Sequence, residues 1–269
     1  MIQVLFNGYR GRMGSALVPG IVSAPDLELV AVCDACSVDP VLKLQTDNGT
    51  IEVPAYHQLA EALDQHQVSV MVDFTQPQAI SSSLAVALPR GVNCVVGTTG
   101  LAAEEYQQIY QQAAEGTCLF VAPNFNLGAV LMMDFARRAA VYFADAEIIE
   151  FHHNGKKDAP SGTAINTARQ MAEARRLAGL TRQSPGAETE LPSFPGARGC
   201  LVDDIPVHSV RGGGFVAHQE VILSSAGENL LIRHDSIDRS SYLPGVLQAI
   251  RSIGGRSGLI IGLEHLLEL

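Results

Sequence analysis

Three glycines near the start of the chain restrict its fold more than any other feature. Gly8, Gly11 and Gly14 follow an apolar stretch at 2–6 and open a segment of helical character at 13–24. Glycine lets the backbone turn sharply and approach a diphosphate closely, while the amino end of the next helix supplies N–H donors. The spacing G-x-x-G-x-x-G differs from the more usual G-x-G-x-x-G, but it meets the same physical needs. The loop therefore predicts a dinucleotide-binding βαβ unit.

An acidic residue completes this unit. Asp34 ends the second apolar stretch and lies 20 residues after Gly14, which is the position from which a carboxylate binds the adenosine ribose. Asp34 favours the unphosphorylated ribose of NADH, whereas Arg10 and Arg12 in the loop are suited to the 2′-phosphate of NADPH. The sequence therefore predicts NADH, NADPH or both as cofactor and leaves the preference open.

The charge balance narrows the classes of partner. The formal net charge is −10, which disfavours nucleic acid and anionic membranes as partners. Residues 1–100 contain only four Lys or Arg, and two of them are Arg10 and Arg12, so the glycine loop is a local cationic exception. Because the sequence has no apolar run of about 18 residues, we expect no membrane span.

The start of the chain and its cysteines predict a cytoplasmic protein. The first residues have neither the basic region nor the long apolar region of a signal peptide. The five cysteines are odd in number and scattered, which fits free thiols in a reducing compartment. Cys33 and Cys36 form a lone C-x-x-C with no second pair, so we expect neither a metal nor a redox role for them.

The first 125 residues alternate between strand and helix, which predicts an α/β domain with a Rossmann-type parallel sheet covered on both faces. The expected strands are 2–6, 27–34, 68–74, 92–97 and 118–122, and the expected helices are 13–24, 56–65, 78–90 and 102–115.

After Pro123 the pattern changes to that of an α+β domain with a mixed or antiparallel sheet. We expect helices at 127–143, 161–178 and 241–252, strands at 146–153, 206–211, 216–224 and 229–235, and a loop at 184–199. The domains predicted are a dinucleotide-binding domain at 1–124 and a substrate-binding and oligomerisation domain at 125–236, with 237–269 packing back on the first.

A polar segment at 150–163 is the strongest candidate for substrate chemistry. It leaves a strand, contains two adjacent histidines and two lysines, and enters a helix through Ser161, Gly162 and Thr163. The amino end of a helix binds a carboxylate, lysine adds positive charge, and histidine supplies a proton near neutral pH. Adjacent histidines on a strand point to opposite sides, so we expect no metal site here. A solvated turn with no function is the alternative for this segment alone.

The segment at 150–164, Glu-x-His-His-x-x-Lys-x-Asp-Ala-Pro-Ser-Gly-Thr-Ala, resembles the signature of the 4-hydroxy-tetrahydrodipicolinate reductase family. Further matches follow one another in the order of the family: Gly-Arg-Met-Gly at 11–14, Asp-Phe-Thr at 73–75, Gly-Thr-Thr-Gly at 97–100, Asn-Phe-Asn-Leu-Gly at 124–128 and Val-Ala-His-Gln-Glu at 216–220. The resemblance covers essentially the whole chain.

The resemblance implies a reaction and a set of site residues. NADH or NADPH would give a hydride to C4 of a small unsaturated dicarboxylate in the diaminopimelate route of lysine biosynthesis. By position, His152 would be the proton donor and Lys156 the second catalytic residue. Substrate would be bound by His153, Lys156, Ser161, Gly162 and Thr163. The cofactor would be lined by Gly8, Tyr9, Arg10, Gly11, Arg12, Met13, Asp34, Phe74, Gly97, Thr98, Thr99, Ala122, Pro123, Asn124 and Phe125. The family also implies a homotetramer that assembles through the sheet of the second domain.

Two departures and two alternatives accompany this interpretation. Asn154-Gly155 replaces a more basic pair, and the turn at 211–215, Arg-Gly-Gly-Gly-Phe, differs from that expected in relatives.

One alternative is another Rossmann-type dehydrogenase, such as aspartate-semialdehyde or homoserine dehydrogenase. The first of these needs an activated cysteine, but Cys94 and Cys118 lie in apolar strands. The other alternative is a non-catalytic NAD-binding sensor, which has no need of the proton donor His152.

Overall fold

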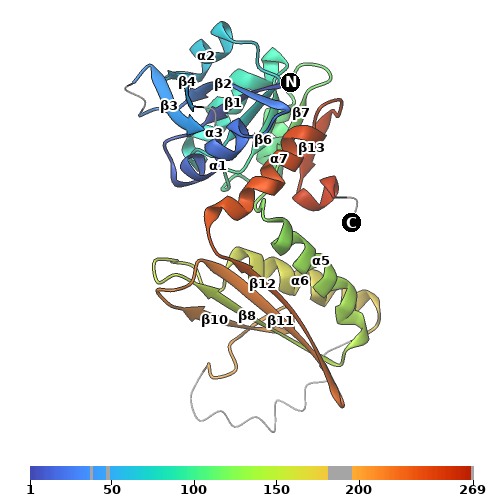
Figure 1. The fold of residues 1–269 in the computed structure, drawn as a ribbon. Coiled ribbons are helices and arrows are strands. Elements are labelled where there is room, and N and C mark those ends of the chain that lie inside the picture. Colours follow the sequence, from blue (N-terminus) through green and yellow to red (C-terminus); the bar gives the residue numbers. More distant parts are fainter. Residues whose placement is uncertain (37–38, 47–48, 181–195, 268–269) are drawn as a thin grey trace. The chain divides into compact units, whose positions relative to one another are not determined.

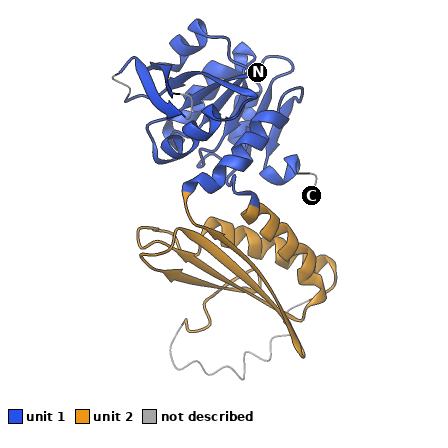
Figure 2. Cartoon of the chain, viewed as in Figure 1, with its two compact units in different colours: residues 1–127, 239–269 blue, residues 128–238 orange. Residues whose placement is uncertain are grey.

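The computed structural model describes residues 1–36, 39–46, 49–180 and 196–267. It divides the chain into two compact units, the first formed by residues 1–127 and 239–269 and the second by residues 128–238 (Figure 2). The boundaries expected from the sequence were 124/125 and 236/237. Most of the loop expected at 184–199 lies outside the described residues.

Unit 1 contains an eight-stranded sheet with the strand order β13-β7-β6-β5-β1-β2-β4-β3 (Figure 1). All neighbouring pairs are parallel except β3 with β4. The prediction of a Rossmann-type parallel sheet is therefore confirmed. The strands are β1 (Ile2–Asn7), β2 (Leu27–Cys33), β3 (Val41–Thr46), β4 (Gly49–Tyr56), β5 (Val70–Asp73), β6 (Asn93–Val96), β7 (Cys118–Val121) and β13 (Gly258–Ile261).

Helices cover both faces of this sheet because its central strands are apolar on both sides. On β1, Leu5 packs into a cluster with Ile80 and Tyr106, while Val4 and Phe6 are buried on the opposite face. The first face carries α2 (Leu59–Gln65), α3 (Pro77–Ala87) and α4 (Ala103–Tyr110), with the short helix η1 (Leu88–Arg90) after α3; the second carries α1 (Arg12–Val22) and α7 (Leu243–Ser252), with η3 (Arg239–Tyr242) and η4 (Leu263–Leu266) beside them.

Three strands of unit 1 were not predicted. The antiparallel pair β3–β4 is a partly exposed hairpin, and its mixture of charged, polar and apolar residues gives only a weak periodic signal. The helix expected from residue 56 was wrong at its start, because Tyr56 ends β4 and α2 begins at Leu59. The strand expected at 118–122 was predicted to be the last one in this sheet. It corresponds to β7, but an additional strand, β13, pairs with β7 in parallel. Four residues are too few to distinguish such a strand from an apolar turn.

Unit 2 contains a five-stranded sheet with the order β12-β11-β8-β10-β9. Because β8 is parallel to β10 and antiparallel to β11, the prediction of a mixed sheet is confirmed. The strands expected at 206–211 and 216–224 follow each other in sequence, yet β8 lies between them. The elements are α5 (Leu127–Ala139), η2 (Ala140–Tyr142), β8 (Asp145–His152), α6 (Gly162–Leu177), β9 (Cys200–Val202), β10 (Ile205–Arg211), β11 (Ala217–Ser225) and β12 (Glu228–Ser236).

The two faces of this second sheet differ. Helices α5 and α6 pack on one face over a core that includes Ile148, Val207 and Val221 (Figure 1). Alternation along each strand turns the intervening side chains to the other face. Leu231 on that face is 56% exposed, and Val210 lies beside Phe151 in the strand register. Within the described residues, unit 2 thus has one face covered by helices and one open face with apolar residues.

Candidate active site

The carboxyl ends of five neighbouring strands in unit 1 bring the predicted cofactor residues to one edge. Strands β2, β1, β5, β6 and β7 are adjacent and parallel, so the loops after them emerge together. These loops and the first two residues of α1 contain every residue predicted to line the cofactor, namely Gly8 to Met13, Asp34, Phe74, Gly97 to Thr99 and Ala122 to Phe125.

The glycine loop has the shape that a diphosphate requires. Gly8 has φ of +86°, a conformation that favours glycine. A Cβ on Gly14 would lie 2.5 Å from the carbonyl oxygen of Tyr9 and 2.6 Å from that of Gly8, so the helix start packs directly on the loop backbone. Gly11 precedes α1 without a side-chain cap, so no capping side chain competes with an anion for the first-turn N–H groups.

Asp34, the residue that follows β2, supports this loop. Its Oδ2 accepts a hydrogen bond from the backbone N–H of Arg10 at 3.2 Å, and its Oδ1 accepts one from Cys36 at 2.9 Å. The carboxylate is half-buried at the mouth of the loop. The three features of a nucleotide site, tight glycines, an uncapped helix and an acid, therefore occur together.

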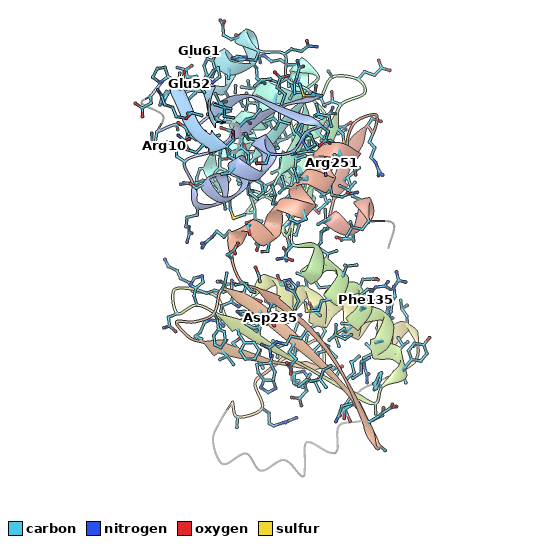
Figure 3. The ribbon with its side chains drawn as sticks, viewed as in Figure 1. Arg10, Glu52, Glu61, Phe135, Asp235 and Arg251 are labelled. Carbon is cyan, nitrogen blue, oxygen red and sulfur yellow. The ribbon has the colours of Figure 1, made fainter. Side chains whose placement is uncertain are left out.

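A cavity of about 850 Å³ adjoins the glycine loop. Tyr9 and Arg10 line it from the loop, and Lys43 and Glu52 line it from the β3–β4 hairpin; Figure 3 labels Arg10 and Glu52. Lys43 is paired with Glu52 at 2.9 Å. The hairpin, which the sequence did not predict, thus brings a second cation to this cavity.

Asp73 fixes the neighbouring loops, a role that the sequence did not indicate. The side chain is fully buried at the end of β5. Its Oδ1 accepts hydrogen bonds from the hydroxyls of Thr75 and Thr98, at 2.7 and 2.8 Å, and its Oδ2 accepts one from Asn7 at 2.8 Å. The loops after β5 and β6 are therefore tied to the end of β1, since one carboxylate binds residues of all three.

Phe74 forms the apolar part of this edge. Its ring stacks on Phe6 and packs against Phe125, with centroids 6.0 and 5.5 Å apart. A Cβ on Gly97 would lie 2.6 Å from Cδ1 of Phe74. Glycine at 97 is therefore required for the ring to lie against this loop.

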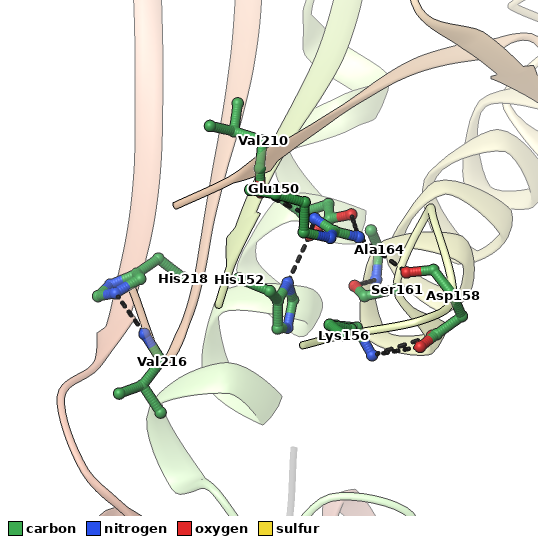
Figure 4. Close-up of polar contacts among 10 residues, drawn as sticks. Glu150, His152, Lys156, Asp158, Ser161, Ala164, Val210, Val216 and His218 are labelled. Carbon is green, nitrogen blue, oxygen red and sulfur yellow. Dashed lines mark hydrogen bonds and ion pairs between the residues drawn. The ribbon is translucent and has the colours of Figure 1, made fainter. Parts of the chain in front are cut away.

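In unit 2, the polar segment starts from a buried carboxylate. Glu150 occupies a helix-facing position of β8, two residues after Ile148, and is fully buried. Arg211 on β10 binds the Glu150 carboxylate through its two terminal nitrogens, Nη1 and Nη2, at 2.9 and 2.8 Å. Nδ1 of His152 lies 2.5 Å from Oε2 of the same carboxylate (Figure 4).

These contacts decide the charge of Glu150 and the orientation of His152. Burial raises the pKa of Glu150, but hydrogen bonds from His152 and Arg211 outweigh it and hold the pKa at about 2. The carboxylate is therefore ionised near neutral pH and accepts hydrogen bonds only. The proton in the Glu150–His152 bond accordingly belongs to Nδ1, and Nε2 is the nitrogen left for other chemistry.

Lys156 is held in the turn that follows. Its backbone N–H donates to the carbonyl of His153 at 3.1 Å, and its Nζ lies 2.9 Å from both carboxylate oxygens of Asp158. The hydrogen bond from Lys156 lowers the pKa of Asp158. Arg211 also donates to the carbonyl of Asp158 at 2.8 Å, so the same guanidinium holds the strand and the turn.

The start of α6 forms the other end of the segment. Ser161 is buried and caps the helix by accepting the N–H of Ala164 at 3.2 Å. Gly162 has open space where a Cβ would be, and Thr163 follows it in the first turn. The carbonyl of Thr163 accepts the hydroxyl of Thr167, which in turn accepts the amide of Gln219, both at 2.8 Å. A helix start of this kind offers N–H groups and a hydroxyl to a carboxylate.

His153 begins the turn. The departure at Asn154-Gly155 follows it directly, and Gly155 lies close to the His153 ring. A Cβ on Gly155 would lie 3.2 Å from Nδ1 of His153. The other departure, at 211–215, lies at the end of β10 and in the turn that leads to β11. It includes Arg211, whose guanidinium binds Glu150 and the carbonyl of Asp158.

The described residues contain neither a metal site nor a membrane-spanning helix. Within the described ranges, no group of three or more His, Cys, Asp or Glu side chains is arranged to hold a metal ion. No helix in the described part of the chain has both the length and the apolar character needed to cross a bilayer.

Comparison with known proteins identifies the family. Residues 2–125 match the model of the N-terminus of dihydrodipicolinate reductase, and residues 128–267 match the model of its C-terminus. The chain belongs to the dihydrodipicolinate reductase family. Like the named reductases of this family, the chain is an oxidoreductase.

Relatives of this reductase family match over nearly their whole length. The 4-hydroxy-tetrahydrodipicolinate reductase of Mycobacterium marinum is 45% identical over 264 residues, covering 97% of each chain. That of Listeria welshimeri is 43% identical over 268 residues, covering 99% of this chain and all of its own. A solved dihydrodipicolinate reductase from Paenisporosarcina with bound dipicolinate is 38% identical, with a TM-score of 0.84 over 98% of this chain and 99% of its own. A probable dehydrogenase from Thermotoga maritima shares the fold only, at 12% identity and a TM-score of 0.61.

Proposed function

We propose that the chain reduces 4-hydroxy-tetrahydrodipicolinate to tetrahydrodipicolinate with NADH or NADPH, in the diaminopimelate route of lysine biosynthesis. The observation that carries this proposal is the Glu150–His152 pair. It presents a histidine of fixed orientation next to a lysine-bearing turn and an open helix start. The relatives named for this reaction, and the one solved with dipicolinate, support the same substrate class.

The proposed chemistry needs a proton donor beside a hydride acceptor. Loss of the C4 hydroxyl as water would first leave an unsaturated carbon at C4. A bound NADH or NADPH would then supply the hydride, which we assign to that carbon. His152, with its Nδ1 proton held by Glu150, donates a proton from Nε2 to the carbon next to C4. The buried pair fixes the ring so that no rotation is needed at the moment of transfer.

Substrate binding is assigned to the turn and to the helix start. Lys156, whose Nζ is held by Asp158, binds a substrate carboxylate and assists loss of the hydroxyl group. The N–H groups of Gly162 and Thr163 and the hydroxyl of Thr163 bind a carboxylate, and Ser161 holds the helix start in place. His153 contacts the ring from the start of the turn.

Cofactor binding is assigned to the edge of unit 1. The glycine loop holds the diphosphate, Asp34 binds the ribose, and the loops after β5, β6 and β7 line the nicotinamide half. Arg10, Arg12 and Lys43 are suited to a 2′-phosphate, whereas Asp34 is suited to a ribose hydroxyl. We therefore assign both NADH and NADPH to this site.

The alternatives lack comparable support. A dehydrogenase that forms a thioester needs an activated thiolate, but burial raises the pKa of Cys94 well above its ordinary value and raises that of Cys118. A non-catalytic sensor needs a nucleotide site but has no use for a histidine bound to a buried carboxylate.

We assign the open face of the unit 2 sheet to self-association, as a homotetramer. Phe151, Val210 and Leu231 give this face an apolar surface of the kind that subunit interfaces cover. The five free thiols favour a reducing compartment, so we assign the reaction to the cytoplasm.

The test is a coupled assay that makes the substrate in place from aspartate semialdehyde, pyruvate and the upstream synthase. Oxidation of NADH or NADPH is followed by absorbance, and each cofactor is tried separately. We expect His152→Gln to lower kcat by about 10²–10⁴-fold with cofactor affinity retained. No oxidation above the blank by the unmodified protein, or normal turnover by His152→Gln, would refute the proposal.

A further inference from the structure

Arg211 contacts two separate parts of the polar segment. Its guanidinium binds both carboxylate oxygens of Glu150, at 2.9 and 2.8 Å, and it donates to the carbonyl of Asp158 at 2.8 Å. Arg211 lies opposite His152 in the register of β10 with β8. One side chain therefore joins β8, β10 and the turn after β8.

The first contact acts on His152. Because the Glu150 side chain is fully buried, an unpaired carboxylate there would be strongly disfavoured. The bidentate guanidinium keeps the carboxylate ionised and fixes its plane. Oε2 of Glu150 therefore has a fixed position from which it accepts the Nδ1 proton of His152.

The second contact acts on Lys156. The carbonyl of Asp158 is held by Arg211, while the carboxylate of Asp158 holds Nζ of Lys156 at 2.9 Å. The backbone of Asp158 is thus fixed to the same guanidinium as Glu150. The guanidinium of Arg211 therefore positions both the ring of His152, through Glu150, and the ammonium of Lys156, through Asp158.

The chain contains a second, similar arrangement that serves as an internal reference. His218 Nδ1 lies 2.7 Å from Oδ1 of Asp235, and Nε of Arg233 binds both oxygens of that carboxylate. The Asp235 side chain is 40% exposed, whereas that of Glu150 is 0% exposed. Solvent screens the exposed trio, so only the buried one depends strongly on its arginine.

We propose that Arg211 is a positioning residue for the proposed reduction, and that it sets the His152 ring through Glu150 and the Lys156 ammonium through Asp158. The role of Arg211 in turnover rests on the proposed function, whereas its role in holding the Nδ1 proton of His152 does not. Lysine cannot replace arginine here, because a single ammonium cannot bind two carboxylate oxygens and a carbonyl in this geometry.

The principal experiment compares Arg211→Lys with Arg251→Lys. Arg251 forms a bidentate pair with Asp26 at 2.8 Å for both contacts, in unit 1 and at the amino end of β2. Both variants lose the same kind of pair, but only one touches the polar segment. We expect Arg211→Lys to lower kcat and to weaken binding of dipicolinate, each by about 10- to 100-fold. Affinity for NADH is expected to stay within about twofold in both variants.

Two readouts separate positioning from loss of folding. In protein labelled with ¹⁵N-histidine, the Nδ1 protons of His152 and His218 give downfield signals, and the His152 signal is identified by its absence in His152→Gln. We expect Arg211→Lys to shift or remove the His152 signal and to keep that of His218. In the His152→Gln background, Arg211→Lys should change kcat little but still weaken dipicolinate binding.

The outcomes are decisive in either direction. An unchanged His152 signal with unchanged kcat, or equal losses in Arg211→Lys and Arg251→Lys, would overturn the proposal. If Arg211→Lys fails to fold, as judged by circular dichroism, Arg211→Gln replaces it and keeps a planar donor. If the unmodified protein oxidises neither cofactor, the proposed function fails, and the His152 signal alone decides whether Arg211 positions the ring.

Discussion

Replacement of Glu150 by glutamine tests whether the buried ion pair stabilises unit 2. The pKa of Glu150 falls from its ordinary 4.5 to about 2, because hydrogen bonds from His152 and Arg211 outweigh the effect of burial. Each tenfold change in proton affinity corresponds to about 1.4 kcal/mol, so ionisation of this group contributes roughly 3 kcal/mol to folding. Since the folded pKa is the lower one, this stability is present above about pH 4.5 and is lost as the pH falls toward about 2.

The measurement is hydrogen exchange of the β8 and β10 amides from pH 2 to 7, which reports opening of unit 2 without requiring the whole chain to unfold in one step. We expect Glu150→Gln to be less stable than the unmodified protein by roughly 3 kcal/mol near pH 6, and the difference to shrink toward zero near pH 2. Asp26→Asn is the control, because it removes the carboxylate of a similar bidentate pair at an exposed site; its effect should be small. A difference that is independent of pH would refute the reasoning.

Three other changes test separate parts of the molecule. Lys156→Ala should raise KM for the dicarboxylate or lower kcat by about 10-fold or more while NADH affinity is retained, because Nζ of Lys156 binds Asp158 within the polar turn of unit 2. Steady-state kinetics measure KM and kcat, NADH fluorescence measures NADH affinity, and loss of NADH binding would contradict the prediction. Gly14→Ala should weaken NADH binding far more than Gly11→Ala, because a Cβ at 14 would lie 2.5 Å from the carbonyl oxygen of Tyr9 whereas a Cβ at 11 would lie 3.3 Å from that of Gly8. Equal losses of NADH affinity in the two variants would count against the loop geometry. Leu231→Asp should lower the native mass measured by light scattering, because Leu231 is 56% exposed on the open face of the sheet; an unchanged mass would exclude this position from the subunit interface.

The sequence predicted those features that depend on local patterns. The strands at the centre of the unit 1 sheet are apolar on both sides, so runs such as 68–74 and 118–122 indicated strands near β5 and β7. Glycines before a helix indicated the turn after β1. The polar turn at 150–163 was recognisable because its charges and its helix start are contiguous in the chain.

Features that depend on distant residues were missed for a physical reason. Arg211 and Glu150 are 61 residues apart, and no periodicity reports that β10 lies beside β8. Asp73 stood at the end of an apolar run and in the Asp-Phe-Thr match at 73–75, but neither pattern indicates that its carboxylate binds Asn7 at the end of β1 and Thr98 in the loop after β6. The hairpin β3–β4 was missed because its side chains are only partly buried, so the hydrophobic pattern that marks a strand is weak.

The division of the chain has a consequence for synthesis. Unit 2 is one continuous stretch, whereas unit 1 needs residues from both ends of the sequence. The ribosome therefore releases all of unit 2 before β13 and α7, and β7 has one unpaired edge until then. An apolar edge strand in a nascent chain is prone to aggregation. A fragment ending at Leu127 would retain that edge permanently, so a stable minimal form of unit 1 requires residues 239–269 as well.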